Sequence, residues 1–469
     1  MRQKNQEGEM KDYQQFEKAA QHLIEKYKVP GSIVAIAHHG KIIYEKPFGY
    51  RNMEESKRVT RDTVFGLASI TKSFTCVAIM QLAEQGKLDI YSPVITYLPN
   101  FKIKNLGYLK EITIFHFMTH SSGLPPLPSL DLAMFRERND ESMIDFIDQH
   151  EETLLNTYDD LINFISNVAL FSKPGKLFSY SNDAYALLGA IIENVSGMTY
   201  EQYVLENVIK RCGLKDTFFH IDDDKTYNNI TTCYEQHEED GTIYAVQDWW
   251  DAPSMRATGF LKSTASDMLT FSTLFINKGI VNNTRILSEE SVKQMLQAHI
   301  KMDPEKYYGF GFAITPNYFG KKLVDHGGSL QSISSKFAII PEEGISIIVL
   351  TNLSGFPASK IMELALNTYF GRDLDAHHLS HEEYKVAPNK LALYEGEYQS
   401  GEGMDIVINV KNDKITFSYK GEYYPTKFIC DNVFYAYMDD VFEPIEIVID
   451  NAGNAIAISI FHRIVPKVN

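Results

Sequence analysis

The sequence predicts an α/β (α+β) fold: an antiparallel sheet flanked by helices with an inserted helical subdomain, followed by a C-terminal antiparallel β-barrel. Strand-like runs occur at both ends of the sequence before residue 371, and the stretch between them has mainly helical periodicity. Because the sheet needs strands from both ends, the helices between them must form an insertion. Short alternating runs after residue 390 predict the barrel.

The elements of the first part are bounded by ordinary turn signals. Pro30-Gly31 ends the first helix, and Pro341-Glu342-Glu343-Gly344 separates the last two strands. The expected elements, in chain order, are a helix at 11–28, strands at 32–37 and 41–48, a mainly helical region from about 74 to 320, strands at 336–340 and 345–350, and a closing helix at 358–369.

Three segments are expected along the chain: a main domain at 11–371, a linker at 372–390 and a small barrel domain at 391–469. The linker contains His377, His378 and His381. This cluster fits a solvated linker better than a metal site. Seven or eight short runs with turn residues between them fill the last segment.

Composition limits the function classes. The 469 residues include 61 acidic and 45 basic side chains, giving a net charge of −16, which argues against nucleic-acid or anionic-membrane partners. No stretch approaches the ~20 consecutive apolar residues of a membrane span, and no signal-peptide pattern follows Met1. The expectation is a cytoplasmic protein as written, or an extracytoplasmic one if the sequence is trimmed. The four scattered cysteines indicate neither a disulfide framework nor a zinc site.

The most informative motif is Ser69-Ile70-Thr71-Lys72, which precedes an apolar helical run. Side chains at i and i+3 are neighbours on a helix, so the Lys72 amine can reach the Ser69 hydroxyl. A lysine with a lowered pKa can activate a serine nucleophile, and the helix N-terminus favours a developing oxyanion. On its own the motif also fits an N-capping serine followed by a surface lysine.

Two further motifs complete a set. Tyr180-Ser181-Asn182 enters a predicted helix after the turn Pro174-Gly175, and His326-Gly327-Gly328-Ser329 leads into the late strands. With these three motifs in this order, the chain resembles the serine β-lactamase and penicillin-binding-protein-like hydrolases, most closely the class C β-lactamase, D-aminopeptidase and carboxylesterase branch. The resemblance spans roughly residues 15 to 370, and it implies the β-lactamase-like fold for the main domain.

The resemblance implies a role for each motif residue. Ser69 would be the acyl-accepting nucleophile, and Lys72 and Tyr180 would share the proton transfers, with the lysine charge favouring the phenolate of Tyr180. Asn182 would form hydrogen bonds with the acyl-side amide of the substrate and with Lys72. The oxyanion hole would be the N–H groups of Ser69 and Ser329, while Gly327 and Gly328, next to His326, would let the substrate approach the strand.

His326 departs from the lactamase pattern, since penicillin-recognising members carry lysine there. Histidine has an ordinary pKa of about 6.5 and is mostly neutral at pH 7. Weaker recognition of a substrate carboxylate is therefore expected, which favours peptidase, amidase or esterase activity over efficient β-lactamase activity.

The resulting hypothesis is a serine hydrolase that acts through an acyl-enzyme on amide or ester bonds of a small-molecule or peptide substrate, of peptidase, D-aminopeptidase or esterase type, with weak β-lactamase activity or penicillin binding left open. The alternative is a catalytically weak ligand-binding or regulatory member of the same fold. No cofactor or metal is expected. The final segment resembles the lipocalin-like module of some related peptidases and could join protomers in a homo-oligomer.

Two inserts are expected in the helical region. Residues 127–152 carry a mixed charge run that fits a solvated cap. Residues 222–251 are acidic and contain both tryptophans, Trp249 and Trp250, which fit either a wall of the cleft or ordinary core.

Overall fold

The fold is that of a computed structural model, which describes the following residues: 2–4, 10–134, 154–220, 228–237, 239–246, 249–378, 382–412, 414–438 and 441–468. Most of the first predicted insert, at 127–152, therefore lies outside the described residues. Among the described residues, no helix combines the length and apolar character needed to cross a membrane.

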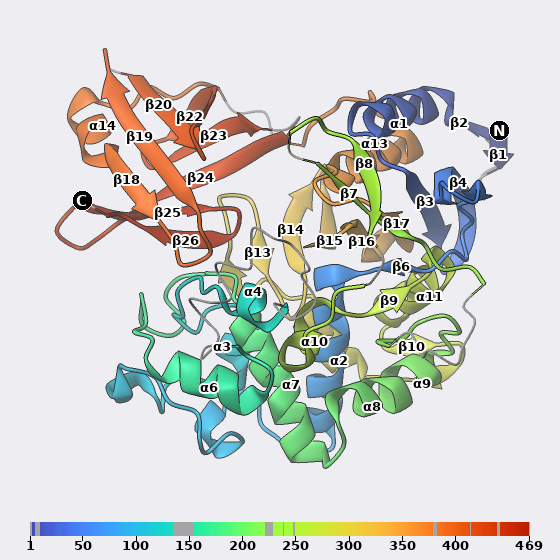
Figure 1. The fold of residues 1–469 in the computed structure, drawn as a ribbon, viewed down its shortest axis with the longest axis horizontal. Helices are drawn as coiled ribbons and strands as arrows, with labels where there is room; N and C mark the ends of the chain where they lie inside the picture. Colours follow the sequence, from blue (N-terminus) through green and yellow to red (C-terminus); the bar gives the residue numbers. More distant parts are fainter. Residues whose placement is uncertain are drawn as a thin grey trace.

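A nine-stranded, wholly antiparallel sheet forms the core of the first part of the chain (Figure 1). Its strand order confirms that both ends of the first part build one sheet, because β17 pairs with β3. The strands, from one edge to the other, are β12 (Ile300–Lys301), β13 (Tyr307–Tyr308), β14 (Ala313–Tyr318), β15 (Lys321–Leu330), β16 (Ile333–Ile340), β17 (Ile345–Thr351), β3 (Gly31–His38), β4 (Lys41–Asn52) and β5 (Lys57–Arg58).

The central strands are buried on both faces. β17 (Ile345–Thr351) is β-branched or apolar apart from Ser346, and every residue in it is buried. Ile347 belongs to the core shared with α1 (Gln14–Lys26) and α13 (Ala358–Phe370), while Ile348 belongs to the core on the opposite face. The alternation of side chains along a strand thus places one helix layer on each face of the sheet.

The predicted helical insertion lies between β5 and β12 and packs beneath the sheet, at the bottom of Figure 1. Short strands β6 (Phe65–Gly66), β7 (Cys233–Gln236), β8 (Ile243–Val246), β9 (Lys262–Ser263), β10 (Ile280–Val281) and β11 (Thr284–Arg285) accompany it. Its helices are α2 (Thr71–Glu84), α3 (Ile114–Met118), α4 (Ser129–Met134), α6 (Tyr158–Ser166), α7 (Asn182–Ser196), α8 (Tyr200–Val204), α9 (Lys210–Cys212), α10 (Arg256–Gly259), α11 (Ala265–Ile276) and α12 (Glu289–Met295).

The C-terminal region begins with α14 (Pro388–Tyr394), a helix that the sequence analysis missed and that starts inside the predicted linker. The described strands then form two antiparallel sheets, joined at one end by a bridge between Tyr398 and Lys467; the strand pairing does not show the predicted closed barrel. The strands are β18 (Gly396–Gln399), β19 (Asp405–Lys411), β20 (Lys414–Tyr419), β21 (Glu422–Tyr424), β22 (Thr426–Cys430), β23 (Val433–Met438), β24 (Val441–Ile449), β25 (Ala455–Ile460) and β26 (Arg463–Pro466).

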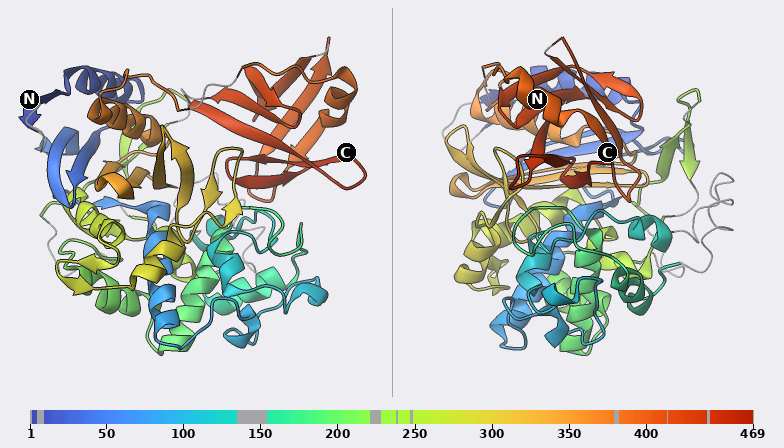
Figure 2. Two further views of the ribbon diagram at one scale, coloured as in Figure 1. Left: turned by 180° about the vertical axis from the view of Figure 1, so that it is seen from behind. Right: turned by 90° about the vertical axis from the view of Figure 1, so that its left-hand side faces the viewer.

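This region has its own apolar core, formed from α14 and both sheets. It lies beside the nine-stranded sheet and above the helical insertion, so that the sheet, the insertion and the C-terminal region meet at one place in the molecule (Figure 2). The hairpin of β25 and β26 turns at Phe461 and His462, both with positive φ, and contacts the first part of the chain at this centre.

Candidate functional site

Ser69 lies in a tight turn rather than in the first turn of a regular helix. The 3₁₀ segment η1 (Ala68–Ile70) leads directly into α2, and Lys72 follows in the first turn of α2. Ala68 has a φ of 45°, in the left-handed region that costs energy for a residue with a Cβ. This turn leaves Ser69 partly exposed between buried neighbours, as a nucleophile requires.

The Lys72 side chain is completely buried and connects two of the predicted motifs. Its Nζ lies 3.2 Å from Oγ of Ser69, 2.9 Å from Oδ1 of Asn182 and 2.8 Å from the carbonyl oxygen of Thr258. Burial, aided by the positive charge of Arg463, lowers the pKa of Lys72 well below its usual range. A neutral amine donates to Asn182 and Thr258 and can accept the proton of Ser69.

Tyr180 lies against the same amine, with its ring centre 4.7 Å from Nζ of Lys72. Burial raises the pKa of Tyr180, and contacts with Ser69 and Arg463 oppose this rise only in part. This direction runs against the expectation that the lysine charge favours the phenolate, because both groups are buried and burial favours the uncharged form of each. Tyr180 is available as a proton donor and Lys72 as a proton acceptor.

His120 holds the Tyr180 segment in place, a role that the sequence analysis did not assign. Its carbonyl oxygen accepts from the N–H of Ser179 at 2.8 Å, and its Nδ1 accepts from the N–H of Ser181 at 3.0 Å. The ring also stacks on Tyr180 with 4.1 Å between centroids. Burial holds the pKa of His120 well below its usual range, which keeps Nδ1 free to accept.

His326 is buried in β15 as a neutral ring. Its Nε2 lies 2.9 Å from the hydroxyl of Tyr308, and its Nδ1 lies 2.6 Å from the carbonyl oxygen of Gly327. Burial is the main cause that lowers the pKa of His326 to about 3. His326 is thus uncharged, as the sequence analysis expected, and its polar atoms are already engaged by protein groups.

The strand after His326 runs close to the nucleophile turn. A Cβ on Gly328 would lie 2.2 Å from the carbonyl oxygen of Leu67, whereas a Cβ on Gly327 would meet nothing closer than 3.8 Å. Only a glycine at 328 permits this approach. The next residue, Ser329, is exposed at the same end of β15, beside the turn that carries Ser69.

The C-terminal hairpin adds groups that no motif indicated. The carbonyl oxygen of His462 accepts from the N–H of Tyr180 at 2.8 Å, and the Ile464 N–H lies 3.4 Å from Oγ of Ser179. The Arg463 guanidinium lies 4.5 Å from the ring centre of Tyr180, and its Nε donates to Glu402 at 2.7 Å. A cation from β26 therefore faces the centre of the predicted site.

The tryptophans of the second insert lie near the same turn. Trp249 and Trp250 line a small pocket together with Gly66 and Gly259. Gly259 in turn approaches the backbone of Ala68 and Ser69. This location favours the cleft-wall interpretation of the two tryptophans.

Comparison with known proteins agrees with this geometry. Residues 16–367 match the family model described as Beta-lactamase. Protein flp of Staphylococcus aureus (strain MW2) is 26% identical over 385 residues, covering 82% of this chain and 70% of that protein. Penicillin-binding protein 4* of Bacillus subtilis (strain 168) is 23% identical over 424 residues, 85% of this chain and 86% of that protein. The octameric penicillin-binding protein homologue from Pyrococcus abyssi is 27% identical with a TM-score of 0.69, over 97% of this chain and 100% of that chain.

Proposed function

Because the chain belongs to the beta-lactamase family, we propose that it is a serine hydrolase that acts through an acyl-enzyme on amide or ester bonds, of peptidase or esterase type. The observation that carries the proposal is the buried Lys72 amine, within hydrogen-bonding distance of both Ser69 and Asn182. A lysine in this setting serves a serine nucleophile as its base.

In the proposed reaction, Oγ of Ser69 attacks the substrate carbonyl carbon while Nζ of Lys72 takes its proton. The N–H groups of Ser69 and Ser329 stabilise the oxyanion, and Asn182 binds the substrate amide. The Tyr180 phenol protonates the leaving amine or alcohol and recovers a proton from Lys72. Water then attacks the acyl-enzyme by the reverse proton path, releasing the acid and restoring Ser69.

Arg463 supports a narrower proposal, that the substrate carries a carboxylate. Position 326 lacks the lysine of penicillin-recognising relatives, and His326 is neutral, so a cation must come from elsewhere. Among the described residues, Nη2 of Arg463 has no hydrogen-bond partner, while its Nε is held by Glu402. A guanidinium fixed at one side and open at the other is suited to binding a carboxylate.

This changes the expectation drawn from His326. A neutral His326 favours substrates without the carboxylate only if no other cation lies near the site. The site now proposed moves that cation to the C-terminal hairpin. Penicillins, which carry a carboxylate, become slow acylating agents of Ser69 in this proposal.

The decisive experiment pairs substrates that differ only in charge. Wild-type enzyme, Ser69→Ala, Arg463→Ala and Arg463→Lys are assayed on a short peptide ester with a free terminal carboxylate and on its neutral amide counterpart. We expect Ser69→Ala to lose activity on both. Arg463→Ala should lose about 10–100-fold in kcat/KM on the carboxylate substrate only, since hydrogen bonds to charged groups are worth about 1.5–3 kcal/mol.

The hydrolase activity and the carboxylate contact of Arg463 can be rejected separately. A Ser69→Ala enzyme as active as wild type, or no covalent adduct at Ser69 after treatment with a fluorophosphonate, would reject the hydrolase. Equal losses on both substrates in Arg463→Ala would reject only the carboxylate contact. Partial recovery in Arg463→Lys on the carboxylate substrate would support it.

The domain division at 11–371, 372–390 and 391–469 is proposed with one change, since α14 starts at Pro388 and packs in the C-terminal core. We further propose that the chain forms a homo-oligomer. The similarity to the octameric homologue from Pyrococcus abyssi supports this, and light scattering of the purified protein tests it.

A further inference from the structure

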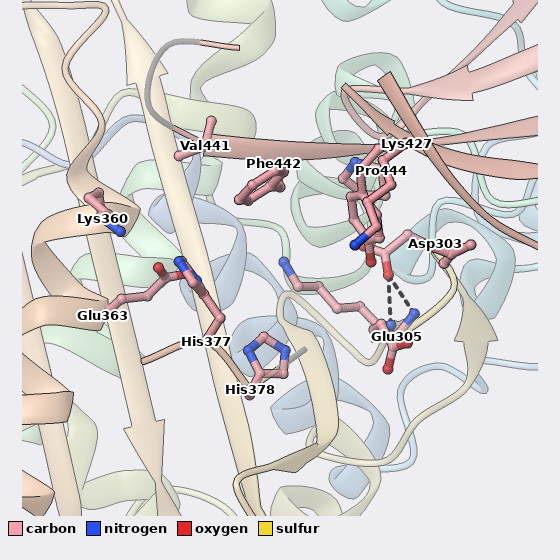
Figure 3. A pocket seen from close by; sticks show the side chains of 13 residues that line it. Asp303, Glu305, Lys360, Glu363, His377, His378, Lys427, Val441, Phe442 and Pro444 are labelled. Atoms are coloured by element: carbon pink, nitrogen blue, oxygen red, sulfur yellow. Dashed lines mark hydrogen bonds between the residues drawn. The ribbon is translucent and has the colours of Figure 1, made fainter. Parts of the chain in front are cut away.

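A second pocket lies between the C-terminal region and the first part of the chain, away from the predicted motifs. Its volume is about 200 Å³. Its walls come from the turn between β12 and β13, from α13, from the segment that follows α13, and from β22 to β24 (Figure 3). The two regions of the molecule therefore enclose it together.

Charged side chains of both signs reach this pocket. Lys360 and Glu363 enter from α13, and Lys306 enters from the β12–β13 turn. None of these three side chains makes a hydrogen bond or an ion pair with another described residue, although Lys360 and Glu363 are one turn apart on the helix. The pocket thus presents two amines and a carboxylate that make no direct hydrogen bond to a described residue, although, against the effect of burial, nearby carboxylates, Asp303 foremost and Glu363 among them, raise the pKa of Lys306.

The opposite wall, from β22 to β24, is mostly apolar but includes Lys427. Phe442, Val441 and Pro444 line it from β24, and Figure 3 shows Phe442 between the α13 side chains and the pair Lys427 and Pro444. Phe442 is 54% exposed, which is unusual for a large aromatic side chain beside a hollow. A ligand with an apolar group would remove this surface from water.

We propose that this pocket binds a small zwitterion with one apolar side chain, of the kind of a free α-amino acid. Lys306 and Lys360 are suited to its carboxylate, Glu363 to its ammonium group, and Phe442 to its side chain. The volume of about 200 Å³ is below the roughly 300–1,000 Å³ of pockets for drug-sized ligands, which favours a small ligand. The proposal is independent of the proposed hydrolase activity.

Both walls of this pocket continue into the candidate active site. Lys306 immediately precedes β13, whose Tyr308 hydroxyl contacts His326. Phe442 precedes Glu443, whose carboxylate accepts from the N–H of Phe461 at the turn of the β25–β26 hairpin. A ligand that joins the two walls therefore holds the hairpin against the central sheet.

The test is calorimetric titration of the full-length protein with leucine, in its L and D forms. We expect binding of at least one form, weakened about tenfold or more by Phe442→Ser and by Lys360→Ala, a change of about 1.4 kcal/mol. Tyr423→Ser is the matched control, because Tyr423 is 69% exposed in the same region and does not line the pocket. It should leave the dissociation constant unchanged, as should Arg463→Ala.

Analogues of the probe separate the three contacts. Leucinamide lacks the carboxylate, N-acetylleucine lacks the ammonium group and glycine lacks the side chain; each should bind at least about tenfold more weakly than leucine. Three outcomes would overturn the proposal. They are no binding of leucine at tens of millimolar, unchanged binding in both pocket variants, and loss of binding in Arg463→Ala, which would place leucine in the active site. Phe442 and Tyr423 are exposed side chains, and a melting curve checks that every variant is folded.

Discussion

Two regions of the molecule meet at Tyr180, and they contribute to the candidate site in opposite ways. The Ser69–Lys72 pair spans three positions of one continuous helical segment. The contact between Ser179 and Ile464 spans 285 positions and joins the helical insertion to the C-terminal hairpin. The first pair depends on local geometry alone, whereas the second depends on how the C-terminal core packs against the first part of the chain. We expect the first to control the chemistry and the second to control which substrate is accepted.

The strongest test of this difference is Lys72→Met. A methionine fills nearly the same volume without the amine, so kcat/KM should fall about 10²–10⁴-fold on every substrate, charged or neutral, the usual contribution of a general base. The melting temperature should be unchanged or raised, because a buried amine is replaced by an apolar group. Steady-state kinetics on the two matched substrates, with calorimetry, measure both. Retention of more than a tenth of the activity would contradict a role for Lys72 as base.

Adjacent glycines provide the next test. In Gly328→Ala the new Cβ would meet the Leu67 carbonyl oxygen at 2.2 Å, so β15 must move away from the Ser69 turn. Displacing one oxyanion donor costs about 10²–10³-fold in kcat, and the overpacking costs about 1–3 kcal/mol of stability. Gly327→Ala is the matched control with its nearest atom at 3.8 Å. Equal effects of the two substitutions would show that β15 does not form the oxyanion hole.

The sequence predicted the local half of the site better than the distant half. The spacing of Ser69 and Lys72, the antiparallel hairpins and the helical insertion all follow from short-range patterns, and the structure contains each of them. Arg463 has no such pattern: it follows an ordinary hairpin turn, and its approach to Tyr180 depends on docking. The contact of His462 uses a backbone carbonyl, which every residue has.

Burial was the other property that the sequence could not provide. Motif spacing indicated that Lys72 lies near Tyr180, but the state of the phenol depends on how much water reaches it. The surroundings that exclude water include His120 and Tyr308, which lie far from Tyr180 in the sequence. Desolvation therefore outweighs the predicted effect of the lysine charge.

The pH dependence of stability tests the burial of His326. Its folded-state pKa of about 3 is below the ordinary value of about 6.5, so below pH 6.5 the unfolded chain binds a proton that the folded chain does not. The stability is fully present above pH 6.5 and is lost as the pH falls towards 3. We expect His326→Gln to reduce the loss between pH 7 and 5 by up to about 2 kcal/mol. Parallel urea-unfolding profiles for variant and wild type would contradict this.

The smallest expected effect concerns Arg463 and its partner Glu402, the part of the site that the C-terminal region contributes. Nε of Arg463 donates to Glu402. Both side chains are mostly buried, Arg463 with 17% exposure and Glu402 with 21%. Glu402→Gln keeps an oxygen acceptor for Nε but removes the negative charge that competes with a substrate carboxylate. KM for the carboxylate substrate should therefore fall roughly threefold, within the ~0.2–1 kcal/mol of a partly exposed ion pair, while the neutral substrate is unaffected. Glu402→Ala removes the acceptor as well, so the guanidinium loses its orientation and KM should rise instead. If both variants change KM in the same direction, Glu402 does not orient Arg463 for the substrate, and the C-terminal hairpin contributes only structural contacts to the site.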